Sequence, residues 1–274
     1  MSKLNPLTDQ ELLAKAPTLF TTEPHFEVSD KYHFIPTIDI IIQLKSLNWY
    51  PMSVQESSVQ ESSVQEISKK GYQKHLVRFR NLDDLLNPQE NAMELLLFNS
   101  HDRSTAFSIS AGIYRFVCAN GLVIADSVFE SHTIKHIGDR YNDVKGAIEE
   151  IVSFKPQLES KIDTFSSIIL STQEKLSFAK SSIGFRFDNH LEIDPHDLLV
   201  PHRVEDEQDD LYTTLNIIQE NLLRGNISGK NKETGRKFTS KQITSIGKDV
   251  NINQSLWNIA EKIAIIKEPS LLVA

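Results

Sequence analysis

The first half of the chain contains short stretches in which hydrophobic and polar residues alternate, which is the pattern of β-strands. Strands are expected at residues 74–80, 93–99 and 105–110. In the first stretch Arg78 and Arg80 share one face and Val77 and Phe79 the other, which predicts a half-buried strand with a basic outer face. The second stretch is apolar on both faces and should be central. Consecutive strands this close together predict an antiparallel β-meander.

Helix signals flank these strands. Thr8 and Glu11 form a capping-box pattern, and a second helix is expected at residues 38–47. In the second half, apolar residues at helical spacing predict helices over 142–170, 171–182, 211–222 and 254–265, and Pro156 should kink or split the first of them. Strands first and helices after, without alternation, indicate an α+β fold: an antiparallel β-meander in the N-terminal half packed by helices, and a helical C-terminal half. We expect a mixed part over residues 1–140 and a mainly helical part over 141–274, packed as one globular unit.

Two segments are harder to assign. Residues 111–119 fit a strand or a short helix, and Asn120-Gly121 fits a hairpin turn or the end of a helix. The spacing of Ile113 and Phe116, with Gly121 at the position of a cap, favours the helix. Strands are expected again at 122–129 and 132–136. The repeat SVQES over residues 53–66 has a period of five, which matches neither a helix nor a strand, so it is interpreted as an insertion in a solvated loop.

Composition limits the classes of function. The 274 residues are 39% hydrophobic and 24% charged, and no apolar run approaches the ~20 residues that span a bilayer, so no membrane partner is expected. The single cysteine, Cys118, excludes an intrachain disulfide, and a reducing cytoplasm fits this composition. The net charge of −8 opposes binding to polyanions by the mean field alone. Any nucleic-acid binding must therefore come from a local basic patch.

A polar cluster follows the expected central strand. Asn99, Ser100, His101 and Asp102 are residue types that favour turns, and a polar turn is the simpler interpretation. The alternative is a catalytic site, with His101 and Asp102 as the candidate residues and His101 as a general base or phosphate contact. Asn120 is a further candidate of this polar cluster.

Cofactor and metal signals are weak. His132 and His136 share a strand face, but two histidines without a third ligand do not define a zinc site, so no metal is expected. The acidic run from Glu205 to Asp210 is more typical of a helix N-terminus than of a cation site. Walker, dinucleotide-binding and nucleophile-elbow motifs are absent from the sequence, and no cofactor is expected. Cys118 is interpreted as a buried structural thiol.

A basic segment stands out in this acidic chain. Residues 224–241 carry six basic side chains against one acidic side chain, Glu233, and glycines at 225, 229 and 235. This composition predicts a mobile, positively charged loop that suits phosphate contacts, although a solvated loop between two helices explains it equally well. The candidate nucleic-acid-binding residues, from this loop and the basic strand region, are Arg78, Arg80, Arg115, Lys230, Lys232, Arg236, Lys237 and Lys241.

Several stretches of the chain resemble the phage/plasmid-like proteins of domain-of-unknown-function family 932. They are LLFNSHDRSTAFSISAGIYRFVCANGLVI, YHFIPTIDII, KHLVRFR, VPHRVEDEQDDLYTTLNIIQENLLRG and SLWNIAEKIA. Arg103 stands where family members usually carry glycine, and Tyr212 where they carry tryptophan. The resemblance implies a setting on plasmids and prophages, and it implies no established reaction.

Three hypotheses of function follow. The leading one is a non-enzymatic protein that binds or anneals single-stranded DNA, as a possible homo-oligomer, with Tyr114 or Phe116 stacking on bases. The second is a nucleic-acid-processing enzyme with its site at His101 and Asp102. The third is an inhibitor that binds a host defence protein, since some such inhibitors mimic the charge of DNA.

Overall fold

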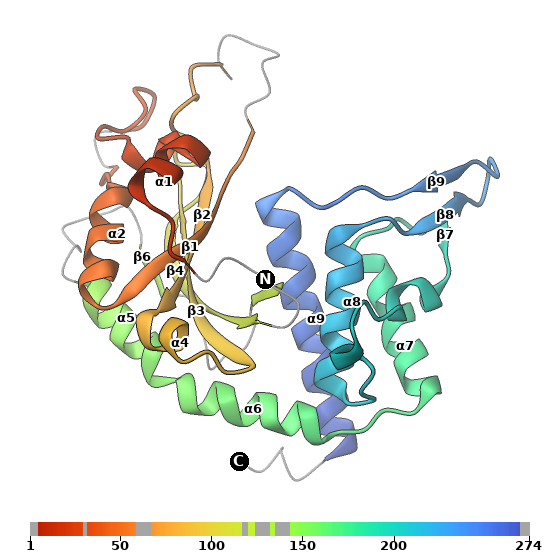
Figure 1. Cartoon of the computed structure of the whole chain (residues 1–274). Helices are drawn as coiled ribbons and strands as arrows, with labels where there is room; N and C mark the ends of the chain where they lie inside the picture. The colour runs from red at the N-terminus through yellow and green to blue at the C-terminus, as the bar shows by residue number, and fades with distance from the viewer. Residues whose placement is uncertain are drawn as a thin grey trace. The chain divides into compact units, whose positions relative to one another are not determined.

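The computed structural model describes residues 5–29, 32–58, 67–116, 120–123, 132–134 and 143–268. The chain forms two compact units (Figure 1). Unit 1 contains residues 1–121 and 128–154, and unit 2 contains residues 122–127 and 155–274. The expectation that the two halves pack as one globular unit stays a prediction.

Unit 1 is built on an antiparallel sheet. The strands of this sheet are β1 (Trp49–Glu56), β2 (His75–Asn81), β3 (Asn91–Asn99), β4 (Phe107–Arg115), β5 (Asn120–Val123) and β6 (His132–Ile134); the last two residues of β5 are assigned to unit 2. The order is β1-β2-β3-β4-β5, with β6 paired to β4. Strands β1 to β4 pair antiparallel with their sequence neighbours, so the predicted β-meander and the α+β class are confirmed.

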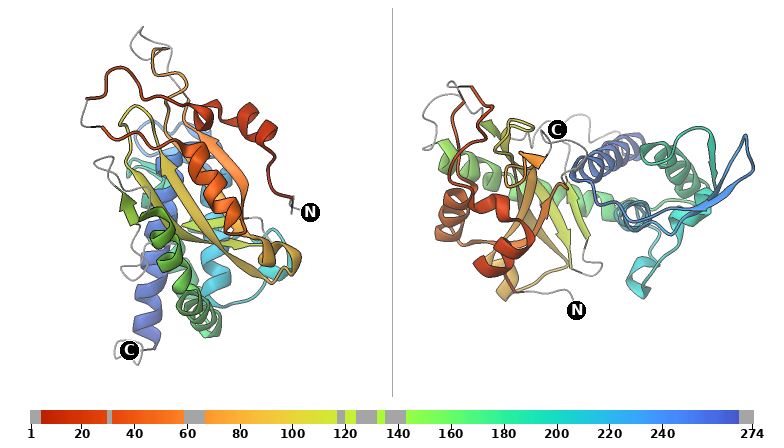
Figure 2. Two further views of the ribbon diagram at one scale, coloured as in Figure 1. Left: turned by 90° about the vertical axis from the view of Figure 1, so that its left-hand side faces the viewer. Right: turned by 90° about the horizontal axis from the view of Figure 1, so that it is seen from above.

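Helices cover one face of this sheet. The helices of unit 1 are α1 (Asp9–Lys15), α2 (Thr37–Ser46), α4 (Leu82–Leu86) and α5 (Asp143–Ser153), with a 3₁₀ turn at Pro17–Phe20. The views agree that α2 and α5 lie on the same side of the sheet (Figures 1 and 2). Thr37 at the start of α2 makes a hydrogen bond with His75 of β2, on the face that also carries Val77 and Phe79. The capping box of Thr8 and Glu11 is present as predicted.

The first strand lies at an edge of the sheet. Pro51 and a register irregularity between Pro51 and Ser53 interrupt its first half. The backbone N–H of Leu7 donates to the Pro51 carbonyl at 2.7 Å, so the chain before α1 runs beside this part of β1. Ser53 to Glu56 of the repeat belong to β1, and their assignment to a loop was wrong, because β2 supplies their pairing partners. Residues 59–66 lie outside the described residues.

The helix predicted over residues 111–119 is wrong for its first half. Residues 111–115 complete β4, where Ala111 pairs with Leu95 and Ile113 with Met93. Pairing with the long strand β3 determines the conformation of these residues, because the helical spacing rested on only a few apolar positions. Residues 117–119, with Cys118, lie outside the described residues. So do residues 124–129 and 135–136 of the two strands expected after them.

Unit 2 is mainly helical. It contains α6 (Lys155–Ser167), α7 (Thr172–Ser182), α8 (Leu211–Arg224) and α9 (Ile246–Lys267), with short 3₁₀ turns at Ile183–Phe185, Pro195–Leu199 and Val204–Asp206. The predicted break near Pro156 is confirmed, because α5 ends at Ser153 and α6 begins at Lys155. The last helix begins at Ile246, eight residues before the predicted start.

A small antiparallel sheet also belongs to unit 2. Its strands are β7 (Leu191–Ile193), β8 (Ser228–Asn231) and β9 (Lys237–Thr239), in the order β7-β8-β9. The prediction of a mobile loop over residues 224–241 is therefore wrong. Each strand here has only three or four residues, which is too short to show a clear alternating pattern. These strands are stabilised by pairing with each other, and β7 is distant from β8 in the sequence.

The predicted amphipathic helix is buried on every side. Residues 211–222 of α8 are all buried, including the polar Asn216, Gln219, Glu220 and Asn221. The helix ends before Gly225, as predicted, and Gly225 has a φ of 80°. A helix surrounded by protein needs internal partners for its polar side chains.

Candidate functional site

A group of exposed basic side chains in unit 2, Lys230, Lys232, Arg236 and Lys237, lies on the hairpin formed by β8 and β9, residues 228–239, here called the basic hairpin. The hairpin projects beyond the helices of unit 2 (Figure 1). Gly229 pairs with Phe238, and Lys230 with Lys237. Because side chains alternate along a strand, Phe238 and Gly229 share one face with Ile193, whereas Lys230 and Lys237 share the other with Glu192.

The lysine face of the basic hairpin is solvent-exposed. Lys230 forms an ion pair with Glu192 at 3.2 Å, and Lys232 Nζ donates to the Asn189 carbonyl at 2.6 Å. Within the described part of the chain, Arg236 and Lys237 have no ion-pair partner. Lys241 is exposed in the segment that follows. This face therefore presents positive charge that carboxylates of unit 2 only partly neutralise.

The base of the basic hairpin is held firmly. The Arg186 guanidinium donates to the carbonyls of Leu222, near the end of α8, and of Lys241, and burial lowers its pKa. A Cβ on Gly225 would lie 2.6 Å from the Lys241 carbonyl carbon, so only glycine permits this close approach. An open pocket of about 400 Å³ lies against the hairpin, lined by Ser228, Gly229, Lys237, Phe238 and Thr239. The basic segment is thus an ordered platform.

The predicted basic outer face of unit 1 is wrong. Arg78 and Arg80 lie on one face of β2 as expected, but their exposed fractions are only 8% and 5%. Glu94 of the neighbouring strand β3 is fully buried and accepts from both, at 3.0 Å from Arg78 Nη1 and 2.9 Å from Arg80 Nε. Charged side chains are rarely buried unless an opposite charge lies beside them, and Glu94 supplies that charge here.

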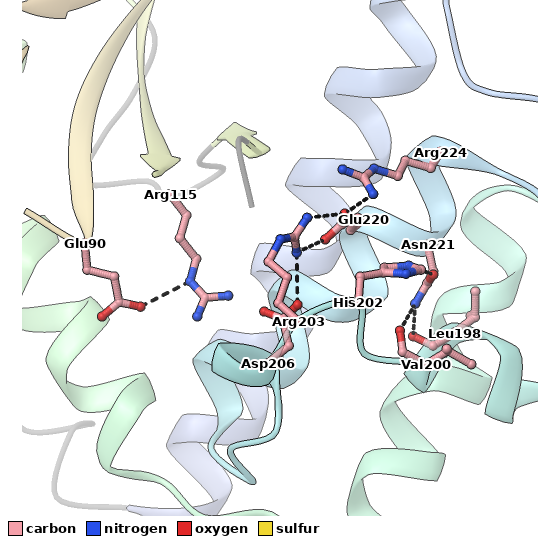
Figure 3. Close-up of polar contacts among 10 residues, drawn as sticks. All are labelled: Glu90, Arg115, Leu198, Val200, His202, Arg203, Asp206, Glu220, Asn221 and Arg224. Atoms are coloured by element: carbon pink, nitrogen blue, oxygen red, sulfur yellow. Dashed lines mark hydrogen bonds and ion pairs between the residues drawn. The ribbon is translucent and has the colours of Figure 1, made fainter. Parts of the chain in front are cut away.

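The third arginine predicted to bind nucleic acid in unit 1 is also buried. Arg115 is 3% exposed, and its Nε donates to Glu90 Oε1 at 3.1 Å (Figure 3). Tyr114 is buried beneath the Arg80 guanidinium, whose Cζ lies 3.2 Å from the ring centroid. Phe116 is partly exposed and packs edge-on against Tyr114. Arg115 and Tyr114 are therefore too buried to offer a surface for bases or phosphates.

The polar turn after β3 is largely buried. Asn99, Ser100 and His101 have no exposed surface. Ser100 Oγ accepts from the Thr105 N–H and donates to its carbonyl, and Asp102 Oδ1 accepts from the Ser104 N–H at 2.9 Å. Arg103 has a φ of 64°, the left-handed conformation that glycine adopts most easily. The side chain of Asn120 lies outside the described ones.

His101 belongs to a buried hydrogen-bond relay. His75 Nδ1 lies 2.9 Å from the Gln73 carbonyl, which only accepts, so this nitrogen carries the proton. His75 Nε2 then accepts from Thr37 Oγ1 at 2.8 Å, and Thr37 Oγ1 accepts from Asn99 Nδ2 at 3.0 Å and from His101 Nε2 at 3.4 Å. Burial lowers the pKa of His75 to about 4, so the imidazole is neutral near pH 7. The relay joins α2 to the sheet.

Metal and membrane signals can be checked for part of the chain. Among the described residues, no group of three histidine, cysteine or acidic side chains is placed to hold a metal ion. His136 lies outside these residues, as does the side chain of His132. None of the described helices combines the length and hydrophobicity that crossing a bilayer requires.

Unit 2 contains a polar network that sequence reasoning missed. Arg203 forms a two-pronged ion pair with Glu220 of α8, 2.7 Å on each side, and a third contact of 2.9 Å with Asp206 (Figure 3). Arg224 contacts the same Glu220 carboxylate at 2.6 Å. Asn221 accepts from His202 at 2.8 Å. These residues lie in the stretch VPHRVEDEQDDLYTTLNIIQENLLRG. The resemblance of this stretch to the family was the one sequence feature that could have pointed to them.

The acidic run before α8 is partly explained by this network. Asp206 pairs with Arg203, and Asp210 caps α8 by accepting from the Thr213 N–H at 2.8 Å. The preferred interpretation, a helix N-terminus, holds for Asp210. The run serves as helix cap and ion-pair partner at these two positions.

The sequence matches proteins without an assigned activity. Residues 24–257 match the family model described as a domain of unknown function, DUF932. Two relatives from Escherichia coli (strain K12), UPF0380 protein YafZ and UPF0380 protein YfjQ, are each 32% identical over 257 residues, which is 93% of this chain and 91% of theirs. No solved structure matches the chain. The chain therefore belongs to the DUF932 family.

Proposed function

We propose that the protein binds single-stranded DNA through the basic hairpin, and that it belongs to a plasmid or prophage. The observation that carries the proposal is the exposed pair of Lys230 and Lys237, which lie directly opposite each other. Like charges at such positions destabilise a sheet. Glu192 relieves this repulsion only on the Lys230 side, and a phosphate group bound between the lysines would relieve the rest.

The chemistry of the hairpin face suits a nucleic-acid backbone. Ser228 and Thr239 pair two residues from the lysine pair, so their hydroxyls share its face. Hydroxyls and lysines are frequent phosphate contacts, which position a strand without reading its sequence. Arg236 adds a charged donor at the turn end of β9. Binding is therefore expected to be sequence-tolerant.

The charge of the whole protein favours a single strand over a duplex. A duplex carries one negative charge per ~1.7 Å of axis, twice the density of one strand. A protein of net charge −8 repels the denser polyanion more strongly. The basic hairpin supplies only a few compensating charges, which match a short single-stranded segment.

The test is fluorescence-anisotropy binding to a labelled oligonucleotide, single-stranded and duplex, across a salt titration. The double variant Arg236→Ala/Lys237→Ala removes two exposed charges that have no ion pair with any described residue. It should bind single strands at least tenfold more weakly and lower the salt slope by about 1.4, since each phosphate contact contributes roughly 0.7.

A matched control removes the same charge elsewhere in unit 2. Lys248 and Lys262 are exposed on α9, so Lys248→Ala/Lys262→Ala should leave the affinity nearly unchanged. Equal losses in both double variants would mean that net charge matters and the hairpin does not. No binding by the wild-type protein at low salt would overturn the proposal.

A further inference from the structure

Unit 2 contains a cavity of about 370 Å³, lined by residues of α7, α8 and the chain between them. Leu176 of α7, Leu199, Pro201 and Ile217 of α8 form its apolar walls, and most of the surface that lines it is apolar. Cavities that bind ligands measure roughly 300–1,000 Å³ and are mostly apolar in this way. The cavity therefore has the size and the lining of a binding site.

The chain that forms one wall of the cavity is held in place by α8. Asn221 Nδ2 donates to the carbonyls of Leu198 and Val200, at 3.1 and 3.0 Å (Figure 3). Arg203 connects Asp206 of the wall to α8 through its ion pair with the buried Glu220 carboxylate. Because these contacts fix the wall before a ligand arrives, little conformational entropy is lost on binding.

Apolar surface continues outside the cavity on the same segment. Val200 is 48% exposed and Val204 is 77% exposed, and the two neighbours of Val200 in the chain, Leu199 and Pro201, line the cavity. A small molecule held inside the cavity leaves both valines in water. A peptide that inserts one side chain can cover them with its other residues, and exposed apolar surface of this kind is typical of protein–protein contacts.

The uncompensated charge beside the cavity is negative. Glu205 and Glu207 are exposed, lie on either side of the buried Asp206, and form no ion pair with any described residue; Glu207 also lines the cavity. The basic side chain of the lining, Lys175, is already paired with Asp209 at 2.5 Å. Two separated carboxylates favour a partner with several positive charges over a ligand that carries one.

The histidine of the cavity lining does not reverse this sign. His196 Nδ1 lies 2.7 Å from Asp194 Oδ1, so a neighbouring carboxylate matches any positive charge on the imidazole. An acidic surface repels nucleic acid and attracts a basic segment of a protein. The cavity is therefore a site of a different kind from the basic hairpin.

We propose that this cavity is the docking site for a partner protein, and that it receives one bulky apolar side chain from a basic segment of that partner. The cavity buries this anchor, Val200 and Val204 contact the residues around it, and Glu205 and Glu207 attract the flanking lysines or arginines. Binding energy at protein interfaces concentrates in buried anchors, whereas charges at the rim set specificity and the rate of association.

The first test uses the wild-type protein and a fluorescein-labelled heptapeptide. The peptide has a central tryptophan with two lysines and one terminal glycine on each side. We expect saturable binding by fluorescence anisotropy, and binding at least ~10-fold weaker when alanine replaces the tryptophan, as for a truncated interface anchor. Glutamates in place of the lysines should abolish binding. No saturable binding of the tryptophan peptide at low salt, or equal Kd values for the tryptophan and alanine peptides, would overturn the proposal.

Tryptamine distinguishes a docking surface from a small-molecule site. It carries the same ring and one positive charge, and it is too small to contact both glutamates and the two exposed valines together. It should displace the labelled peptide only at a much higher concentration than the unlabelled peptide requires. Displacement by the two competitors at equal concentrations would assign the cavity to small amines and overturn the proposal.

Variants locate the peptide on the protein. Leu176→Trp fills the cavity from α7, and Glu205→Lys/Glu207→Lys reverses the charge beside it; each should weaken peptide binding at least ~10-fold. The matched control Asp188→Lys/Glu233→Lys reverses two exposed carboxylates of unit 2 outside the cavity lining and should keep most of the affinity. Thermal unfolding checks that each variant is folded, and the exposed charge reversal remains informative if Leu176→Trp is not. Equal losses in the two charge reversals would overturn the proposal.

The two proposals for unit 2 fail independently. Arg236→Ala/Lys237→Ala should bind the peptide like the wild type while it loses affinity for DNA. A loss of peptide binding in this variant equal to that in Glu205→Lys/Glu207→Lys would overturn the assignment of the peptide to the cavity.

Discussion

The arginines of the unit 1 sheet and the basic side chains of the unit 2 hairpin look alike in sequence and differ in environment. Both groups sit on short strands with alternating patterns. In unit 1, Glu94 and Glu90 lie beside the arginines, and all of these arginines are buried. In the hairpin, Glu192 neutralises one lysine, and the strands remain exposed. The nearby carboxylates, and not the basic residues themselves, distinguish a structural cluster from a candidate binding surface.

The largest expected effect comes from removing the shared carboxylate. Glu94→Gln removes the buried carboxylate that Arg78 and Arg80 share, and the free energy of unfolding should fall by about 3–5 kcal/mol. Glu192→Gln, the matched change at the exposed pair, should alter it by less than ~0.5 kcal/mol. Urea denaturation of both variants measures the contrast. Similar small losses in the two variants would remove the distinction between the clusters.

A pH effect is expected from the buried relay. Burial lowers the pKa of His75 to about 4 from 6.5. Between these two pH values the unfolded chain binds a proton that the folded chain does not bind, so the free energy of unfolding rises with pH. The contribution of His75 to this free energy is complete above pH 6.5 and is lost as the pH falls to 4. Its size is about 3 kcal/mol. Denaturation of the wild type and of His75→Gln at several pH values measures it. If the free energy of unfolding changes with pH equally steeply in the variant, the pH dependence comes from other groups.

The hairpin anchor should have an intermediate effect. Arg186→Met removes the donors to the Leu222 and Lys241 carbonyls and should cost about 1–3 kcal/mol. Amide hydrogen exchange should rise in residues 226–241 before it rises in α8. If exchange rises equally throughout unit 2, Arg186 stabilises the whole unit and is not a specific anchor of the hairpin.

The smallest effect is expected at the tip of the hairpin. Arg236→Ala/Lys237→Ala should change the free energy of unfolding by less than ~0.5 kcal/mol, because both side chains are exposed and lack ion pairs in the described structure. The same variant should lose DNA affinity. A loss of stability above ~1 kcal/mol would show that these charges serve the fold.

The parts of the fold that depend on local sequence were predictable. The capping box of Thr8 with Glu11 forms as expected, and a second box forms at Ser171 with Glu174, because the partners in each lie three residues apart. The central strand β3 also follows from its own hydrophobic run.

The parts that depend on distant partners were not predictable. The end of β4 and the three short strands of unit 2 need pairing partners that periodicity does not identify. The same holds for the candidate sites. Whether Arg80 or Lys237 is exposed is decided by the residue on the adjacent strand, and the buried Glu220 was hidden within an otherwise amphipathic pattern.

The irregular first strand of unit 1 affects how copies of the protein can associate. Unpaired edge strands are the usual sites of sheet continuation between chains and of aggregation. In β1, Pro51 offers no N–H, and its carbonyl already accepts from Leu7. Intermolecular strand addition at this edge is thus blocked around Pro51. A ring or filament of this protein would have to be built from side-chain contacts or from the other strands.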